Sequence, residues 1–404
     1  MNVFVMNAGS SSVKAAYYEG QAEAEVLRDA AWSAEIRWSS LPSRAEVHWR
    51  RANDSGSRSA SVDEHSSAAG AVVQAALESA RIAPDVVGHR VVHGLSESRC
   101  AIIDARVRGV IETAAALAPL HNSAALAGID AIAHFFPAVP QAADFDTAFH
   151  TTLPAAAAAY ALPYDWFAQR GLRRYGFHGI SHRYCAERTA ELFSLEPHNL
   201  RMVSAHLGNG CSLAAIVGGR SVDTTMGFTP LDGLMMGSRS GSVDPGLLLY
   251  LLRSNAYGVA DLDRILNVES GLAGVSQVSE DVRDVLVAAE GGAAPAQLAL
   301  DMYVHRVSAG IAAMAAATGG IDALAFTGGV GEHSAYVRDR VCDRLDFLGI
   351  ALGSEVTDDG PDREISAADS RVRVAIVHAR EEYAIARDVA ALLTHAPAVA
   401  PTAS

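Results

Sequence analysis

Three glycine-rich segments of this 404-residue sequence have the composition of a phosphate-binding turn. They lie at residues 7–14, 206–212 and 327–332, and each follows an apolar run typical of a strand. Glycine and serine leave backbone N–H groups unhindered, so that several can converge on one anion. Lys14 is the only lysine in the chain, and its flexible ammonium suits a phosphate whose geometry changes. An ordinary polar hairpin is the alternative for the first segment, which lacks the Walker A pattern.

Cationic and acidic side chains occur beside other apolar runs. Arg90 lies inside the apolar strand predicted at 85–94, so it is either half of a structural ion pair or an anion ligand facing a cleft. Asp146 follows a strand predicted at 139–145, a position typical of ligand sites and also of helix N-caps. Arg239, between Ser and Gly, could offer a bidentate fork to a carboxylate or phosphoryl group. His178 belongs to a dense basic and imidazole cluster at 173–182.

The composition limits the class of protein. Half of the residues are apolar and few are aromatic, which favours helices packed on sheets, and the length favours two domains. A formal charge of −14 argues against a nucleic-acid partner. We expect no membrane partner and a cytoplasmic location, because no apolar run is long enough to cross a bilayer and no signal sequence precedes the first hairpin. Four scattered cysteines indicate reduced thiols.

The elements that position these groups can be predicted from periodicity. Besides the strands above, we predict helices at 68–81, 111–117 and 124–135, and a last amphipathic helix that ends at 393. We predict a loop at 51–67 and a helix break at 119–123. Further strands are predicted at 13–18, 34–38, 45–49, 201–207, 213–217, 322–326 and 372–378. A constant offset of 199 aligns the first two glycine turns, matching Gly9 with Gly208 and Ala15 with Ala214. This repeat agrees with a duplicated domain.

Taken in order, the segments at 7–14, 88–94, 145–150, 175–182, 206–210, 221–241, 326–332 and 381–388 resemble the acetate kinase family, of the acetate and sugar kinase, Hsc70 and actin superfamily. The resemblance covers nearly the whole chain. It implies an α/β fold of two duplicated actin-like ATPase (ribonuclease H-like) domains with a cleft between them. The domains would be 1–147, completed by a C-terminal helix at 381–394, and 148–380, with a disordered tail at 395–404. It also implies a homodimer.

The resemblance further implies reversible transfer of the ATP γ-phosphoryl group to acetate, giving acetyl phosphate and ADP. Asp146, His178 and Arg239 match the catalytic positions of the family. The acid's carboxylate and methyl group would be bound by Arg90, Val92, Leu120, Phe177 and Pro230. Asn7 and Glu381 match the positions that hold Mg²⁺, for which Mn²⁺ could substitute. The nucleotide contacts would be Ser10, Ser12, Lys14, His206, Leu207, Gly208, Asn209, Gly210, Asp281, Val282, Arg283, Gly329, Val330, Gly331, Glu332 and His333.

Several positions depart from the family pattern. His333 and Arg380 stand where Asn is usual, and Ser242 replaces a common Asp. Ser123 and Ala124 follow Asn122 where two prolines are usual. Two alternatives stay open at this point. One is a relative that acts on propionate or butyrate, since one methylene is worth only about 1–3 kcal/mol in an apolar pocket. The other is a nucleotide-switched binding protein of the actin or Hsc70 kind.

Overall fold

The computed structural model describes residues 1–9, 12–20, 29–38, 43–353 and 360–394. It divides into two compact units, which we describe separately: unit 1 comprises Met1–Ala148 and Arg380–Ser404, and unit 2 comprises Phe149–Ala379. None of the described helices is both long enough and apolar enough to cross a membrane. Ser10 and the tail predicted to be disordered lie outside the described residues.

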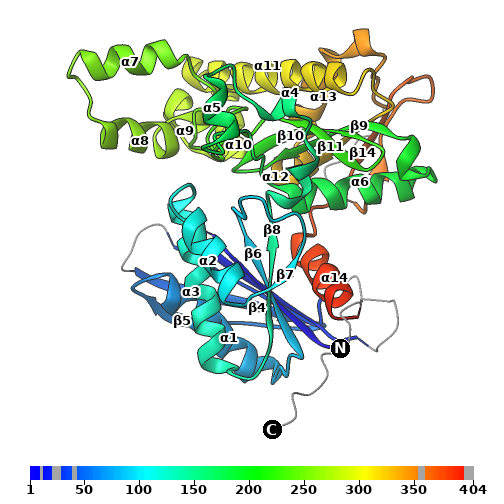
Figure 1. The fold of residues 1–404 in the computed structure, drawn as a ribbon. Helices are drawn as coiled ribbons and strands as arrows, with labels where there is room; N and C mark the ends of the chain where they lie inside the picture. Colours follow the sequence, from blue (N-terminus) through cyan, green and yellow to red (C-terminus); the bar gives the residue numbers. More distant parts are fainter. Residues whose placement is uncertain (10–11, 21–28, 39–42, 354–359, 395–404) are drawn as a thin grey trace. The chain divides into compact units, whose positions relative to one another are not determined.

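Unit 1 is built on a sheet whose strand order is β5-β4-β3-β2-β1-β6-β8-β7 (Figure 1). The first five strands are antiparallel neighbours, whereas β1, β6 and β8 run parallel. Their bounds are β1 Val3–Ala8, β2 Ser12–Tyr18, β3 Trp32–Arg37, β4 Ser43–Arg51, β5 Asp54–Val62, β6 Val86–Val91, β7 Ala101–Ile102 and β8 Gln141–Phe145. Since β1 is buried on both faces, it reads as a nearly continuous apolar run, whereas β6 also carries His89 and Arg90.

Helices cover both faces of this sheet. The helix α14 (Glu381–Thr394) packs on one face, where a Cβ added to Gly88 of β6 would lie 2.8 Å from Ile385. Glycine at position 88 therefore allows the close approach of α14. The opposite face carries α1 (His65–Ala80) and α3 (Pro119–Phe135), with α2 (Ala105–Ala114) beside α3. This arrangement places the first residues of α14 near the carboxyl ends of β1 and β6.

Unit 2 has a six-stranded sheet in the order β11-β10-β9-β12-β14-β13. Its strands are β9 Arg201–Leu207, β10 Cys211–Val217, β11 Arg220–Thr224, β12 Ala323–Thr327, β13 Arg363–Glu364 and β14 Arg373–Ile376. Its α-helices are α4 Ala155–Ala158, α5 Tyr164–Ala168, α6 Gly179–Phe193, α7 Pro245–Arg253, α8 Val259–Val268, α9 Gly271–Ser276, α10 Val282–Glu290, α11 Ala294–Ala317, α12 Gly328–His333 and α13 Ala335–Asp343. In the described part of the chain, 3-10 helices lie at Pro197–Asn199 and Asp346–Leu348, and another, Ala148–Thr152, begins at the last residue of the first segment of unit 1.

The two sheets share one topology. In each, three antiparallel strands are followed by two strands parallel to the first, β3-β2-β1-β6-β8 in unit 1 and β11-β10-β9-β12-β14 in unit 2. A short antiparallel strand, β7 or β13, closes the matching edge. The offset of 199 superposes β2 on β10 residue for residue. The duplicated α/β fold predicted from the sequence is confirmed.

Three local predictions were wrong. The predicted loop 51–67 contains β5, an exposed edge strand whose serines alternate with Gly56, Arg58 and Ala60, so that no apolar pattern marks it. The predicted break at 119–123 is the first turn of α3, because Pro119 occupies a first-turn position, where its missing N–H costs little. The glycine-rich turn predicted at 327–332 lies almost entirely within a helix, α12. The helices α1 and α2 also begin earlier than predicted.

Candidate active site

A row of polar side chains crosses one face of the unit 1 sheet. Lys14 on β2 pairs directly with Asn7 on β1, and residues in register on neighbouring strands project to the same face. Arg90 follows the Met6–His89 pair of β1 and β6, so it lies beside Asn7 in the same row. Because α14 packs on this face, its first residues can meet the row. Lys14 itself is half-exposed, with its Nζ 4.0 Å from Glu35 Oε1.

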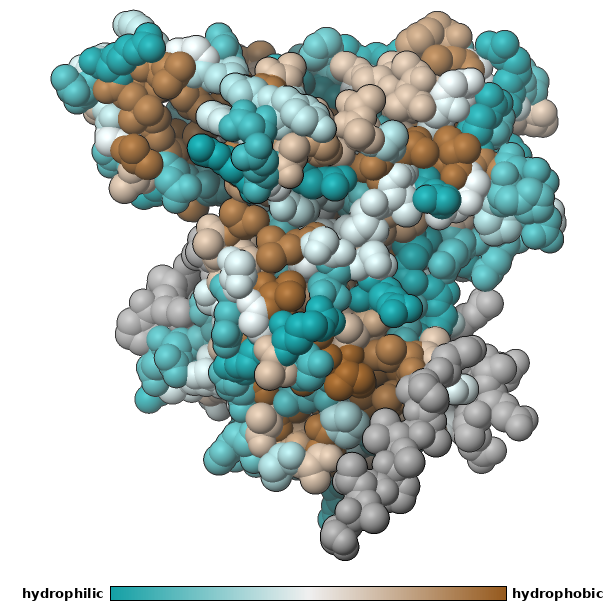
Figure 2. Space-filling view, in the orientation of Figure 1, coloured by the Kyte–Doolittle hydropathy of each residue, from teal (hydrophilic) through white to brown (hydrophobic). Residues whose placement is uncertain are grey.

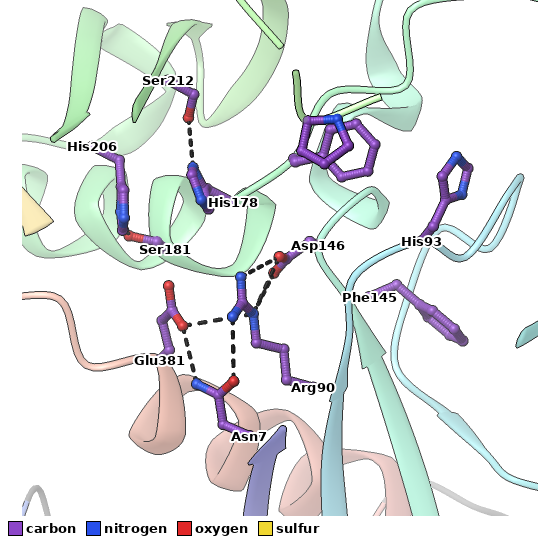
Figure 3. Close-up of polar contacts among 12 residues, drawn as sticks. Asn7, Arg90, His93, Phe145, Asp146, His178, Ser181, His206, Ser212 and Glu381 are labelled. Atoms are coloured by element: carbon purple, nitrogen blue, oxygen red, sulfur yellow. Dashed lines mark hydrogen bonds and ion pairs between the residues drawn. The ribbon is translucent and has the colours of Figure 1, made fainter. Parts of the chain in front are cut away.

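Arg90 forms a buried, bidentate ion pair with Asp146 (Figure 3). Its Nη2 donates to Asp146 Oδ2 at 2.6 Å, its Nε lies 3.2 Å from both carboxylate oxygens, and its Nη1 donates to Asn7 Oδ1 at 3.2 Å. Burial alone would lower the pKa of Arg90, but the charges of Asp146 and Glu381 outweigh it and raise the pKa. The sequence left two alternatives for Arg90, a structural ion pair or an anion ligand. The structure shows the ion pair, and the binding of an anion by Arg90 stays a prediction.

Two further acids reach this cluster from the first turn of α14. Asn7 Nδ2 donates to Glu381 Oε2 at 3.3 Å and to Glu382 Oε1 at 3.0 Å, and Glu381 Oε2 lies 3.6 Å from Arg90 Nε. Three carboxylates around one arginine leave an excess of negative charge on oxygen ligands, which fits Mg²⁺. Within the described part of the chain, no three His, Cys, Asp or Glu side chains form a ready metal cage.

The predicted pocket residues of unit 1 lie just beyond β6. Val92 is buried, at 4% exposure, in the turn that follows the strand. Leu120 belongs to the first turn of α3, but its side chain is outside the part of the chain that the structure describes. Ser12 begins β2, where its carbonyl accepts a hydrogen bond from the Gly9 N–H and closes the first glycine turn.

In unit 2 the predicted catalytic residues His178 and Arg239 converge on the second glycine turn. A Cβ built on Gly210 would lie 2.8 Å from Arg239 Nη2 and 3.2 Å from His178 Nε2. The His178 ring also stacks on His206, with centroids 4.2 Å apart. Glycine at 210 therefore leaves open the space between two groups that can donate to an anion.

Serine hydroxyls fix these imidazole rings (Figure 3). His178 Nδ1 lies 2.9 Å from Ser212 Oγ, and the same hydroxyl lies 2.7 Å from Nε2 of the fully buried His182. Ser181 Oγ lies 2.8 Å from His206 Nδ1. Burial lowers the pKa of His182 well below its ordinary value, so this ring is neutral. The Ser212 bond to Nδ1 leaves Nε2 as the His178 nitrogen that faces the Gly210 turn.

The pocket residues predicted in unit 2 are linked to the predicted catalytic residues through backbone groups. Arg239 Nη1 donates to the Pro230 carbonyl at 2.7 Å. Phe177, at 1% exposure, precedes His178, and its carbonyl accepts from His150 Nε2 at 3.0 Å. Since burial lowers the pKa of His150 to about 4, its neutral ring carries the proton on Nε2 and accepts from Ser221 at Nδ1.

The remaining predicted nucleotide residues of unit 2 border the second glycine turn. A Cβ on Gly208 would lie 3.9 Å from the Gly329 nitrogen of α12, and the Gly237 N–H donates to the Asn209 carbonyl at 3.0 Å. The carboxylate of Glu332 faces the backbone, accepting from Gly328 and Ala379 N–H at 2.8 Å each. Among the others, Leu207 and Val282 are buried, Val330 is half-buried, Gly331 is buried and His333 is exposed.

Asp281 and Arg283 lie at the start of α10. Asp281 is its N-cap residue and accepts from the Arg283 N–H at 2.9 Å, and the two side chains form an ion pair. The neighbouring Glu280 approaches Gly237, because a Cβ on this glycine would lie 3.2 Å from Glu280 Cβ. The predicted adenosine segment therefore adjoins the loop that contains Arg239.

Sequence reasoning gave no role to several residues that shape the site. His182 and Ser212 were inside recognised segments, and the spacing of four residues between His178 and His182 indicates one helix face. In the sequence, Asn122 stands out only for its place in a departure from the family pattern, yet its amide is fully buried and makes three hydrogen bonds. Glu382 contacts Asn7 as closely as Glu381 does.

Comparison with known proteins extends these observations to the whole chain. Residues 2–387 match the model of the acetokinase family. The chain belongs to this family. It is 49% identical to the acetate kinase of Gloeobacter violaceus, over 96% of this chain and 98% of that protein. The crystal structure of Porphyromonas gingivalis acetate kinase is similar, with a TM-score of 0.86, 38% identity and coverage of 97% and 99% of the two chains.

A propionate kinase from Francisella tularensis subsp. tularensis SCHU S4 is similar as well, with a TM-score of 0.87, 33% identity and coverage of 96% of this chain and 98% of that chain. Membership of the acetokinase family makes this chain an enzyme of the kinase class, as the sequence predicted. The likeness to these solved structures also agrees with the duplicated fold described above.

Proposed function

We propose that this acetokinase-family enzyme transfers the γ-phosphoryl group of ATP to acetate, reversibly, giving acetyl phosphate and ADP. The observation that carries the proposal is the buried Arg90, held by Asp146 and Asn7, in a chain whose full-length relatives are acetate kinases. A buried guanidinium can pair with the carboxylate of a small acid in a water-poor site.

The two anionic reactants must be neutralised and aligned. We assign Arg90 to the acid's carboxylate and Val92, Leu120, Phe177 and Pro230 to its methyl group. Asp146 orients the guanidinium through its two oxygens. Removing a proton is not its task, because a carboxylate nucleophile has none to lose at neutral pH.

His178 and Arg239 are assigned to the equatorial oxygens of the transferring phosphoryl group. Fixed N–H donors that face a glycine turn are suited to charge that spreads over these oxygens. A carboxylate oxygen forms the new bond to the γ-phosphorus, and the bond from that phosphorus to the β,γ-bridging oxygen breaks, so the electron pair leaves with ADP. Bond formation and cleavage thus balance without an added base.

The nucleotide phosphates are assigned to Ser10, Ser12, Lys14, the turn at 206–210 and the segment at 329–333, and the adenosine to 281–283. Asn7 and Glu381 would hold Mg²⁺, and Mn²⁺ could replace it, since the residues around Arg90 offer hard oxygen ligands. When bound, the ion supplies positive charge to the phosphate oxygens. In this scheme Asn7 also links the other proposed metal ligand, Glu381, to the Arg90 guanidinium.

Propionate is the second candidate substrate, because the similar solved structures include a propionate kinase. The two acids differ by one methylene, which an apolar pocket discriminates by only about 1–3 kcal/mol. The ratio of kcat/KM for acetate and propionate decides between them.

We further propose a homodimer in the cytoplasm. Helix α7 exposes Leu247, Leu249 and Tyr250 by 48%, 49% and 66%, and Figure 2 shows apolar side chains gathered over this helix. Contiguous apolar surface of this kind marks protein interfaces.

All four cysteines are buried and free, which agrees with a reducing compartment such as the cytoplasm.

The test is hydroxylamine trapping of acyl phosphate with Mg·ATP and acetate, propionate or butyrate. The variant Arg90→Ala should lose hydroxamate formation. Arg108→Ala is the matched control, since Arg108 also pairs with an aspartate, Asp130, but at the surface. If no acid yields hydroxamate while ATP still binds, the proposal fails in favour of a nucleotide-switched binding protein.

A further inference from the structure

The turn that carries Val92 leaves the sheet without a neighbouring strand. The ladder between β6 and β8 ends at the pair Val91 and Phe145. One more backbone bond, from the Asp146 N–H to the Val91 carbonyl at 2.9 Å, holds the two chains together. Beyond Val91, the backbone groups of His93 need partners from elsewhere, because His93 is fully buried.

The side chain of Asn122 supplies both partners. Its Oδ1 accepts from the His93 N–H at 3.0 Å, and its Nδ2 donates to the His93 carbonyl at 2.9 Å. The second Nδ2 hydrogen goes to the Ile111 carbonyl of α2 at 3.1 Å. One amide thus gives His93 the donor and the acceptor that an adjacent strand would give, and anchors them to α2 and α3.

The other side of the same turn is fixed to the segment that carries Asp146. The Gly94 N–H donates to Thr147 Oγ1 at 3.1 Å, and a Cβ on Gly94 would lie 2.4 Å from the Phe145 ring. The turn at 92–94 is therefore held between Asn122 and the end of β8. Loss of either anchor allows Val92 to move relative to the Arg90–Asp146 pair.

We propose that Asn122 is a positioning residue for the carboxylate substrate, which sets the place of Val92 beside Arg90 and so the preference among short acids. This inference rests on the proposed function. Asn122 touches neither reactant in it and acts through the backbone of His93. Because errors of about 1 Å in a site can cost about a hundredfold in rate, a loosened turn should affect catalysis strongly.

The test compares Asn122→Ala, Asn122→Ser and a control, Val73→Ala. The serine hydroxyl can keep one of the bonds to His93, so the series is graded. Val73 is a fully buried residue of α1, and its truncation loosens the unit 1 core without touching the turn. In Asn122→Ala we expect the KM for acetate to rise about tenfold or more, with the KM for ATP within about twofold. The ratio of kcat/KM for propionate over acetate should rise at least about threefold, and Asn122→Ser should lie between.

Amide hydrogen exchange gives a second measurement that needs no activity. Exchange at His93 should be faster in both Asn122 variants and unchanged in Val73→Ala. The proposal is overturned if acid KM, acid preference and His93 exchange in the Asn122 variants match those of the control. If the wild type forms no acyl phosphate, the proposed function fails first, and faster exchange at His93 would still support the anchoring role of Asn122.

Discussion

Arg90 and Asp146 face each other with Nη2 and Oδ2 2.6 Å apart, and the arginine Nε is 3.2 Å from both oxygens of the acid. Their side chains are 16% and 1% exposed, so both charges are largely removed from water. A guanidinium held in this way keeps its remaining N–H groups in a fixed direction. The pair is therefore the rigid element on which the proposed carboxylate site depends.

The variant Asp146→Asn tests that dependence. It keeps the shape of the side chain but leaves Arg90 without its closest counter-charge, so we expect kcat/KM for acetate to fall about a hundredfold or more. Breaking a buried pair also destabilises the fold, by up to about 3–5 kcal/mol. Steady-state kinetics and urea unfolding measure the two effects. Asp130→Asn, which affects the exposed Arg108 pair, should change both little, and equal losses in the two variants would contradict the role of Asp146.

Replacing two glycines of unit 1 by alanine should change the free energy of unfolding in opposite directions. In Gly94→Ala the added methyl would lie 2.4 Å from the Phe145 ring, so overpacking should lower the free energy of unfolding by about 1–3 kcal/mol. Gly109 in α2 has no neighbour within 4 Å of an added Cβ, and Gly109→Ala should stabilise by about 0.5–1 kcal/mol. Urea unfolding measures both changes. A change of the same sign in the free energy of unfolding of both variants would refute the packing described for the turn.

Stability should fall on mild acidification because of buried histidines. Burial lowers the pKa of His89 to about 4, below the ordinary 6.5, so the unfolded chain takes up the proton first as the pH falls. His89 therefore stabilises the fold above pH 6.5, and this contribution is lost between about pH 6.5 and 4, by up to about 1.4 kcal/mol per pH unit. In His89→Gln the pH dependence should be shallower by that amount. Tryptophan fluorescence mainly follows unit 1, which has Trp32, Trp38 and Trp49 of the four tryptophans, whereas Trp166 lies in unit 2. An unchanged slope would contradict the burial argument.

The proposed dimer predicts a specific effect on helix α7. Tyr250→Asp places a charge in its exposed apolar surface and should convert the dimer to a monomer in light scattering. Tyr164→Asp in α5 is the control, because Tyr164 is even more exposed, at 79%. A monomeric wild type, or loss of the dimer in the control alone, would exclude α7 as the interface.

The hairpins and the repeat could be predicted from the sequence because their signals are local. The glycine turns and the offset of 199 identify β1, β2, β9 and β10 within a residue or two. The partners of Arg90 and of His93 are not local. Arg90 meets Asp146 only because β6 and β8 pair with Arg90 opposite Asp144, and Asn122 meets His93 only because α3 begins at Pro119. Neither register nor helix start is fixed by residue types alone, since edge strands such as β5 and first-turn prolines carry weak or ambiguous patterns.

The most direct test of the account follows an oxygen atom of the acid. Acetate labelled with ¹⁸O in its carboxylate is incubated with Mg·ATP and the enzyme, and the acyl phosphate is observed by ³¹P NMR. The account predicts ¹⁸O in the bridge between carbon and phosphorus, because an acetate oxygen attacks the γ-phosphorus, and it predicts loss of this product in Arg90→Ala but not in Arg108→Ala. Release of inorganic phosphate alone, or acetyl phosphate without the bridging label, would contradict it.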